Sequence, residues 1–144
     1  MKYNPDVLQK VLTEYLEASQ RLKELASLSF NEWSGDPHKI ASTKYHLILV
    51  IESAIDICNH VIAKNNFRVP EDYGDTFKVM AENDIISEAF SSNLTNMARF
   101  GNRLVHRYWD INTEKIYDIL QHNLDDLDDL DHFLNELRSS LKYL

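Results

Sequence analysis

The chain has few of the residues that interrupt helices or cross-link a fold: its 144 residues include 3 glycines, 3 prolines and 1 cysteine. So few glycines and prolines leave little material for tight turns, which favours long helices over many short strands. A single cysteine excludes an internal disulfide and is typical of a reducing compartment. Cys58 lies among Ile55, Ile57 and Ile62, a pattern that predicts a buried structural thiol rather than a reactive one.

Long apolar runs and an excess of positive charge are also missing. The segment Met1–Asp6 has no secretory apolar core, and no apolar run approaches the roughly 20 residues that cross a bilayer. We therefore expect a soluble, cytoplasmic protein without membrane contact. The net charge of -8 argues against general coating of nucleic acid, which needs a positive field, although it allows a local basic cleft.

Apolar residues recur at helical spacing along most of the chain, which reads as one domain covering residues 1–144. Asn4-Pro5 and Asp36-Pro37 are helix-start signals, and residues 29–36 between the first two helices read as a connection. Together these patterns predict helices at about residues 5–28, 37–65, 76–82, 84–107 and 113–142. The predicted fold is all-α: an antiparallel four-helix bundle with an additional short helix.

An acidic run from Asp125 to Asp131 lies in the last predicted helix. Such a run of carboxylates suggests a cation site, but its leucines keep helical spacing and no glycine supplies the turn of a calcium loop. We interpret the run as a solvated helix face.

The most informative segment, residues 99–109, places three arginines, an amide, a histidine and a tyrosine within about three helical turns. One helical face carries the polar residues Arg99, Asn102, Arg103 and His106. Another face carries an apolar stripe, formed by Met97, Ala98, Gly101, Leu104 and Val105. The helix is predicted to anchor itself by the stripe and to present a cationic, proton-exchanging surface, which suits chemistry on a phosphate.

The pattern Arg99-x6-His106-x-Tyr108 resembles the R-x4–6-H-x-Y signature of HEPN-domain proteins, and the wider sequence resembles their HepT-like branch. Further agreement lies in three segments, Glu52–Ile57, Val69–Tyr73 and Asn102–Ile111. The resemblance covers roughly residues 45–120. It implies a HEPN-like helical-bundle homodimer whose two motif helices face each other across one composite cleft.

The resemblance also implies metal-independent RNA cleavage without a cofactor, by a toxin that a partner holds in check. That partner resembles a minimal nucleotidyltransferase, which is thought to transfer AMP to the motif tyrosine, here Tyr108. One position departs from the family pattern. In the commonest version the arginine directly precedes the asparagine, a place that Gly101 occupies here.

Each motif residue has a predicted role in cleavage. Histidine exchanges protons at neutral pH because its ordinary pKa is near 6.5, so His106 is the predicted general acid/base. Arg99, helped by Arg103, is predicted to stabilise the charge on the phosphate. Asn102 would orient the imidazole or contact the phosphate, and Tyr108 would hydrogen-bond the RNA or stack on a base. No cluster with metal-ligand spacing lies nearby.

Other interpretations remain open from the sequence. His106 and Tyr108 could simply cap the end of their helix, with the arginines paired to surface acids. The chain could also be a catalytically inactive HEPN-like module that binds a nucleotidyltransferase, or a plain helical oligomer. His60 lies four residues after Asp56, the spacing of a helical side-chain pair, although it could instead line the cleft with Glu52.

Overall fold

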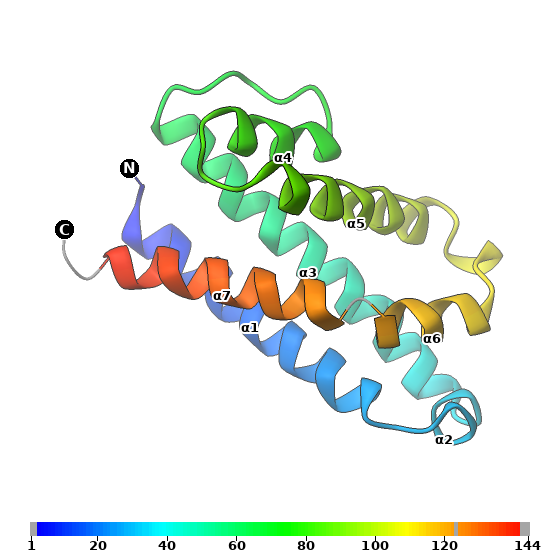
Figure 1. Cartoon of the computed structure of the whole chain (residues 1–144). Helices are drawn as coiled ribbons and strands as arrows, with labels where there is room; N and C mark the ends of the chain where they lie inside the picture. The colour runs from blue at the N-terminus through cyan, green and yellow to red at the C-terminus, as the bar shows by residue number, and fades with distance from the viewer. Residues whose placement is uncertain (1–2, 123, 142–144) are drawn as a thin grey trace.

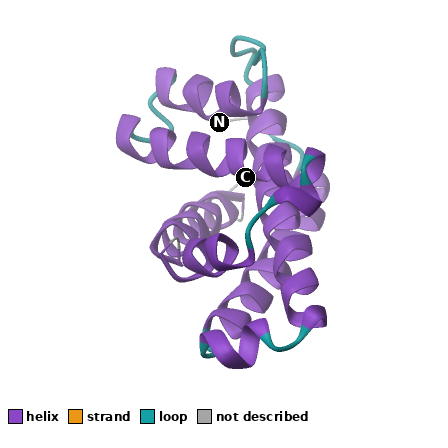
Figure 2. Ribbon diagram, turned by 90° about the vertical axis from the view of Figure 1, so that its right-hand side faces the viewer, coloured by secondary structure: helices purple, strands orange, loops and turns teal. Residues whose placement is uncertain are grey.

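The computed structural model describes residues 3–122 and 124–141, and every regular element in those ranges is helical (Figures 1 and 2). The elements are α1 (Pro5–Ala26), α2 (Phe30–Ser34), α3 (Pro37–Lys64), α4 (Tyr73–Glu82), α5 (Glu88–His106), a 3₁₀ turn (Tyr108–Asp110), α6 (Thr113–His122) and α7 (Leu124–Leu141). Figure 1 shows α1 and α3 running antiparallel, with α5 and then α6 and α7 continuing the alternation. The predicted all-α bundle is confirmed.

Side-chain caps start the helices. Asn4 and Asp36 cap α1 and α3 by accepting a hydrogen bond from the backbone N–H two residues later, at 3.0 and 2.9 Å. Asp72 and Ser87 cap α4 and α5 through the N–H three residues later, at 2.8 and 3.1 Å. Each oxygen satisfies an N–H that has no partner within its helix.

Several predicted boundaries were wrong. The connection at residues 29–36 contains the short helix α2, capped by Ser29. Helix α4 begins at Tyr73, three residues earlier than predicted, because Asp72 caps it. Helix α5 begins at Glu88 rather than 84, since Asp84 has a φ of 59°, a left-handed conformation that a helix cannot continue through.

The last predicted helix is two helices, α6 and α7. Residue 123 between them and residue 142, the predicted end, lie outside the described residues.

Helix α3 runs through the middle of the fold and packs against α1, α2, α4, α5 and α6. By length and composition it could cross a membrane, which corrects the expectation that no segment approaches that size. More than half of its most apolar stretch is buried inside the bundle, so its hydropathy is accounted for by the core.

Cys58 lies on this helix, fully buried as predicted, and burial raises the pKa of its thiol to about 12.

The acidic run is more than a solvated face, and that interpretation is wrong for Asp131. Its carboxylate accepts hydrogen bonds from Ser19 Oγ at 3.0 Å and from Lys23 Nζ at 2.6 Å, both on α1. Burial, and next a hydrogen bond to Asp131, raise the pKa of Tyr15 on the same helix. Asp128 adds a second ion pair to Lys23 at 3.0 Å. These contacts join α7 to α1.

Candidate functional site

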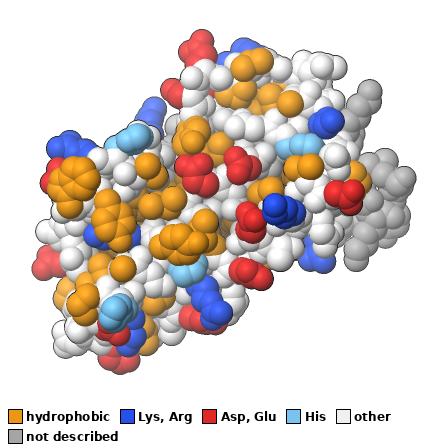
Figure 3. All heavy atoms as spheres, turned by 180° about the vertical axis from the view of Figure 1, so that it is seen from behind, with side chains coloured by type: hydrophobic (Ala, Val, Ile, Leu, Met, Phe, Trp, Pro, Cys, Tyr) orange, Lys and Arg blue, Asp and Glu red, His pale blue; other side chains and the backbone are white. Residues whose placement is uncertain are grey.

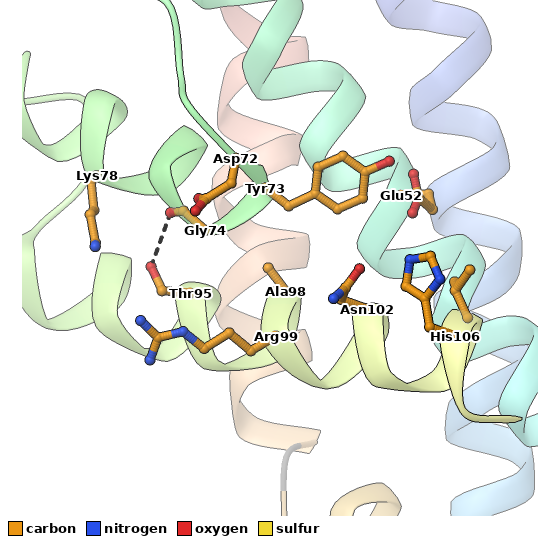
Figure 4. Close-up of a pocket in the computed structure, with 11 residues that line it drawn as sticks. Glu52, Asp72, Tyr73, Gly74, Lys78, Thr95, Ala98, Arg99, Asn102 and His106 are labelled. Carbon is orange, nitrogen blue, oxygen red and sulfur yellow. Dashed lines mark hydrogen bonds between the residues drawn. The ribbon is translucent and has the colours of Figure 1, made fainter. Parts of the chain in front are cut away.

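A cavity of about 510 Å³ opens between α3, α4 and α5 (Figure 4). Its walls include residues from all three helices: Glu52, Tyr73, Lys78, Arg99, Asn102 and His106. Three of the predicted site residues therefore meet in one place, together with groups from two other helices.

Helix α5 presents Arg99, Asn102 and His106 to the cavity because residues three and four apart share a helical face. All three are exposed. In Figure 4 the Arg99 side chain runs toward the N-terminal end of α5, away from His106, with Asn102 between them. The imidazole and the amide thus lie at one end of the cavity, and the guanidinium points to the other.

Helix α4 reaches the cavity because Gly74 lets its first turn lie against α5. Thr95 Oγ1 donates a hydrogen bond to the carbonyl of Gly74 at 3.3 Å, the dashed line of Figure 4. A Cβ on Gly74 would lie 3.1 Å from Thr95 Cγ2, closer than most such contacts. A methyl group at this position would require the Thr95 side chain to shift by a few tenths of an ångström.

The close approach of α4 brings Tyr73 toward Glu52 of α3, whose carboxylate the tyrosine hydroxyl faces (Figure 4). The Glu52 charge, followed by burial, raises the pKa of Tyr73. Sequence reasoning assigned no role to Tyr73 or Lys78. The signal for Tyr73 was present, since it closes the Val69–Tyr73 segment that carries part of the family resemblance.

Arg68 fixes the loop that leads into α4. Its guanidinium donates to Asp75 Oδ2 at 2.6 Å and to Glu82 Oε1 at 2.9 Å. Arg68, followed by the backbone N–H of Glu71, lowers the pKa of Asp75 to about 2. The loop is thereby tied to both ends of α4, whose first residue, Tyr73, lines the cavity.

Gly101 faces the core, as predicted. A Cβ at this position would lie 2.8 and 2.9 Å from Cδ1 and Cγ2 of Ile51 on α3, too close without movement of that side chain. The close neighbour is thus the side chain of Ile51. An arginine here, as in the commonest form of the motif, would have to displace Ile51, so packing accounts for the departure.

Val105 was predicted to lie in the buried stripe, and this was wrong. It is 48% exposed and lines the cavity beside His106. Gly101 and Leu104 take the buried positions at this end of α5, which turns Val105 outward.

Arg103 and Tyr108 lie outside this cavity. Arg103 lines a second cavity, between α3, α5, α6 and the start of α7, together with Arg99. Tyr108 lies in the 3₁₀ turn after α5, where Lys44 Nζ is 4.2 Å from the centroid of its ring. The predicted site is thus divided among the main cavity, the second cavity and the turn.

Comparisons with known proteins agree with the all-helical fold. A family model described as Ribonuclease HepT-like matches residues 15–136. The chain belongs to this family. The mRNA nuclease HepT of Shewanella oneidensis is 32% identical over 77 residues, which are 54% of this chain and 58% of that relative. A putative RNase of Archaeoglobus fulgidus is 30% identical over 102 residues, 71% of this chain and 76% of that protein.

Solved structures show the same fold. A toxin–antitoxin crystal structure with AMP-PNP has a TM-score of 0.81 at 22% identity and covers 91% of this chain and 98% of that chain. The tri-AMPylated Shewanella oneidensis HEPN toxin in complex with MNT antitoxin has a TM-score of 0.80 at 23% identity, with the same coverage. YutE of Bacillus subtilis, a cytosolic protein of unknown function, has a TM-score of 0.80 at 17% identity, covering 96% and 92%.

The arginines of this HepT-like chain differ in their partners. Arg107 pairs with Asp110 at 3.1 Å, as the capping interpretation expects. Among the described residues, Arg99 and Arg103 form no ion pair, so their charge is available to an anion. On the face drawn in Figure 3, acidic and basic side chains are interspersed. The main cavity likewise contains both signs of charge, since Glu52 and Asp72 line it together with Lys78 and Arg99.

His60 does not line the cavity, whereas Glu52 does. The His60 Nε2 accepts a hydrogen bond from the backbone N–H of Asn4 at 2.7 Å, which requires an unprotonated nitrogen. The predicted pairing with Asp56 is replaced by this contact with the start of α1. Burial, followed by the charge of Lys64, lowers the pKa of His60.

Proposed function

We propose that this HepT-like chain is a metal-independent RNA endonuclease and the toxin of a toxin–antitoxin pair. The observation that carries the proposal is the exposed group of Arg99, Asn102 and His106 in one open cavity of about 510 Å³. Family membership supports the choice of RNA as substrate. Because the 2′-hydroxyl of RNA can itself attack the adjacent phosphorus, proton transfer and charge stabilisation suffice for cleavage.

His106 is the proposed general acid/base. Its imidazole removes the proton of the 2′-hydroxyl as the new P–O bond forms, and a proton is returned to the 5′-oxygen as the old bond breaks. The products are a 2′,3′-cyclic phosphate and a 5′-hydroxyl. Asn102, one turn earlier, orients the imidazole or holds the phosphate.

Arg99 is the proposed charge-stabilising group, with Arg103 in support, because a guanidinium stays charged and binds phosphate oxygens in pairs. Its direction in Figure 4 means that the side chain must swing toward His106 or serve a phosphate held on a second copy of the chain. The second arrangement requires a homodimer around α5. Val105 and Trp109, 48% and 77% exposed, are apolar groups that a second copy would cover.

The proposed antitoxin is a minimal nucleotidyltransferase that transfers AMP to Tyr108. The hydroxyl oxygen attacks the α-phosphorus of ATP, its proton is lost to solvent, and pyrophosphate leaves. Tyr108 is 38% exposed and lies in a turn after α5, where a partner's active site can reach it. A modified tyrosine beside the cavity would obstruct the RNA.

The decisive experiment is induction in bacteria, without a partner, of the wild-type chain, His106→Ala and His38→Ala. His38 is an exposed histidine on α3 outside the cavity, which makes it the matched control. Growth arrest with RNA decay is expected for wild type and His38→Ala only. In EDTA, purified wild type and His38→Ala should cleave RNA, whereas purified His106→Ala should not. Equal RNA decay with His106→Ala would refute the role of the histidine.

The second candidate function is a catalytically inactive module that binds a nucleotidyltransferase. The arrangement that favours it is Gly101 in the usual arginine position, with Arg99 directed away from His106. Normal growth with all three soluble proteins would support the module, and affinity for the nucleotidyltransferase without affinity for RNA would establish it.

A further inference from the structure

The second cavity, of about 360 Å³, has both apolar and charged walls. Among the motif residues, only Arg99 and Arg103 line it. Its floor is apolar and at most 8% exposed, formed by Leu47, Ile51, Met97 and Leu120. Phe100, half-buried, stands in its wall. Its volume lies in the range of pockets that hold small ligands, about 300–1,000 Å³.

Three cations border this cavity: Arg99, Arg103 and Lys115. All are exposed, and none has an ion pair within the part of the chain that the structure covers. The three cations make part of the cavity rim locally basic in a chain of net charge -8. One acid, Asp126, also lines the cavity and is half-buried. Such a site favours an anion that also offers a flat apolar surface and a hydrogen-bond donor.

Arg99 is shared by both cavities. Seven residues separate Arg99 from His106, a rise of about 10 Å along α5. In the orientation drawn in Figure 4, Arg99 therefore lies closer to a neighbouring unit of a bound strand than to the phosphate at His106.

We propose that the second cavity binds one nucleotide of the RNA strand next to the nucleotide cleaved at His106. The proposal rests on RNA as the substrate of the main cavity. Lys115 holds the phosphate of this nucleotide, the base stacks on Phe100, and the Asp126 carboxylate accepts a hydrogen bond from a base amine or ribose hydroxyl. This site determines affinity and base preference, whereas the proton transfers belong to His106.

The test is binding of a short single-stranded RNA that carries 2′-O-methyl groups and so cannot be cleaved. Phe100→Leu keeps an apolar side chain but removes the flat ring, and should weaken binding roughly tenfold. Phe100→Tyr keeps the ring and should bind as the wild type does. Phe133→Leu, a half-buried phenylalanine on α7 outside the cavity, is the matched control and should change nothing.

Lys115→Gln tests the phosphate contact through its salt dependence. The slope of log affinity against log salt should fall by about 0.7, the value for one phosphate of a single strand. Lys10→Gln, an exposed lysine on α1, should leave the slope unchanged. Melting curves and light scattering on every variant confirm that fold and oligomeric state are retained.

The outcomes separate this proposal from the proposed function. If wild type cleaves RNA but Phe100→Leu and Lys115→Gln bind the methylated RNA normally, the second cavity is refuted and the nuclease stands. If wild type does not cleave but binds the RNA, and both variants lose affinity, the second cavity stands and the nuclease fails. A change in oligomeric state instead of RNA affinity would assign the cavity to a second copy of the chain and overturn the proposal.

Discussion

Lys44 of α3 makes two contacts with Tyr108, one with its ring and one with its backbone carbonyl. Its Nζ lies 4.2 Å from the centroid of the tyrosine ring and donates a hydrogen bond to the tyrosine carbonyl at 3.2 Å. The two residues are 64 positions apart in the chain. The turn that carries Tyr108 is therefore tied to the central helix, and the ammonium group holds the ring of the proposed AMP acceptor in place.

Lys44→Met should slow AMP transfer to Tyr108, because it removes the charge and the donor while keeping a chain of similar length. A cation–π contact at an exposed site is worth about 0.5–1 kcal/mol, so we expect a loss of roughly two- to fivefold. The rate is measured by intact mass during incubation with the nucleotidyltransferase and ATP. Lys10→Met should accept AMP at the wild-type rate, and Tyr108→Phe should accept none. Equal rates for Lys44→Met and wild type would contradict the role of Lys44.

Gly101→Ala should lower the free energy of unfolding by about 1–3 kcal/mol, because the new methyl group overpacks against Ile51. The clash is expected to outweigh the gain in helix propensity, about 1 kcal/mol. Urea unfolding measures the effect, with Ser92→Ala at an exposed site on α5 as the control. Ile51→Ala removes both clashing atoms, so the double variant should be less destabilised than the sum of the singles. If the destabilisation of the double variant equals the sum of the two single effects, the contact with Ile51 is not what destabilises Gly101→Ala.

Asp131→Ala should destabilise the fold by about 1–3 kcal/mol, since it leaves Ser19 and Lys23 without their shared acceptor. Asp129→Ala, at an exposed position in the same acidic run, should stay within about 0.5 kcal/mol of the wild type. Denaturant unfolding of the two variants at equal salt makes the comparison. Equal effects would restore the interpretation of the whole run as a solvated face.

The pH dependence of stability should include a contribution from His60. Its pKa is lowered in the folded chain, so between the folded pKa and the ordinary value near 6.5 the unfolded chain binds more protons. The stabilisation is full above about pH 6.5 and declines as the pH falls toward the folded pKa.

His60→Gln retains an oxygen that can accept from Asn4 but does not titrate. The difference in melting temperature between pH 7.5 and 5.5 should therefore be smaller in His60→Gln than in the wild type. His38→Gln, whose side chain is exposed, should keep the wild-type difference. An unchanged difference in His60→Gln would rule out this contribution.

Short-range signals predicted the starts of α1 and α3 because a cap acts within a few residues. Asn4 and Asp36 act where the sequence placed them. The starts of α4 and α5 were misplaced because Asp72 and Ser87 were not recognised as caps. The one-turn helix α2 was missed because so short a segment carries no periodic pattern.

The candidate site was only partly predictable for a related reason. Arg99, Asn102 and His106 share a face by helical geometry alone, which holds wherever the helix forms. Glu52, Tyr73 and Lys78 reach the same cavity from α3 and α4, and no spacing along the chain encodes that meeting.

Local residue order thus settled that the chain is helical, where its main helices run, and which motif side chains lie together on α5. Packing between distant segments settled the rest. It turned Val105 outward, kept residue 101 small against Ile51, and placed Arg103 in a second cavity rather than beside His106. Periodicity is a property of neighbouring residues, whereas these outcomes depend on contacts between helices far apart in the chain.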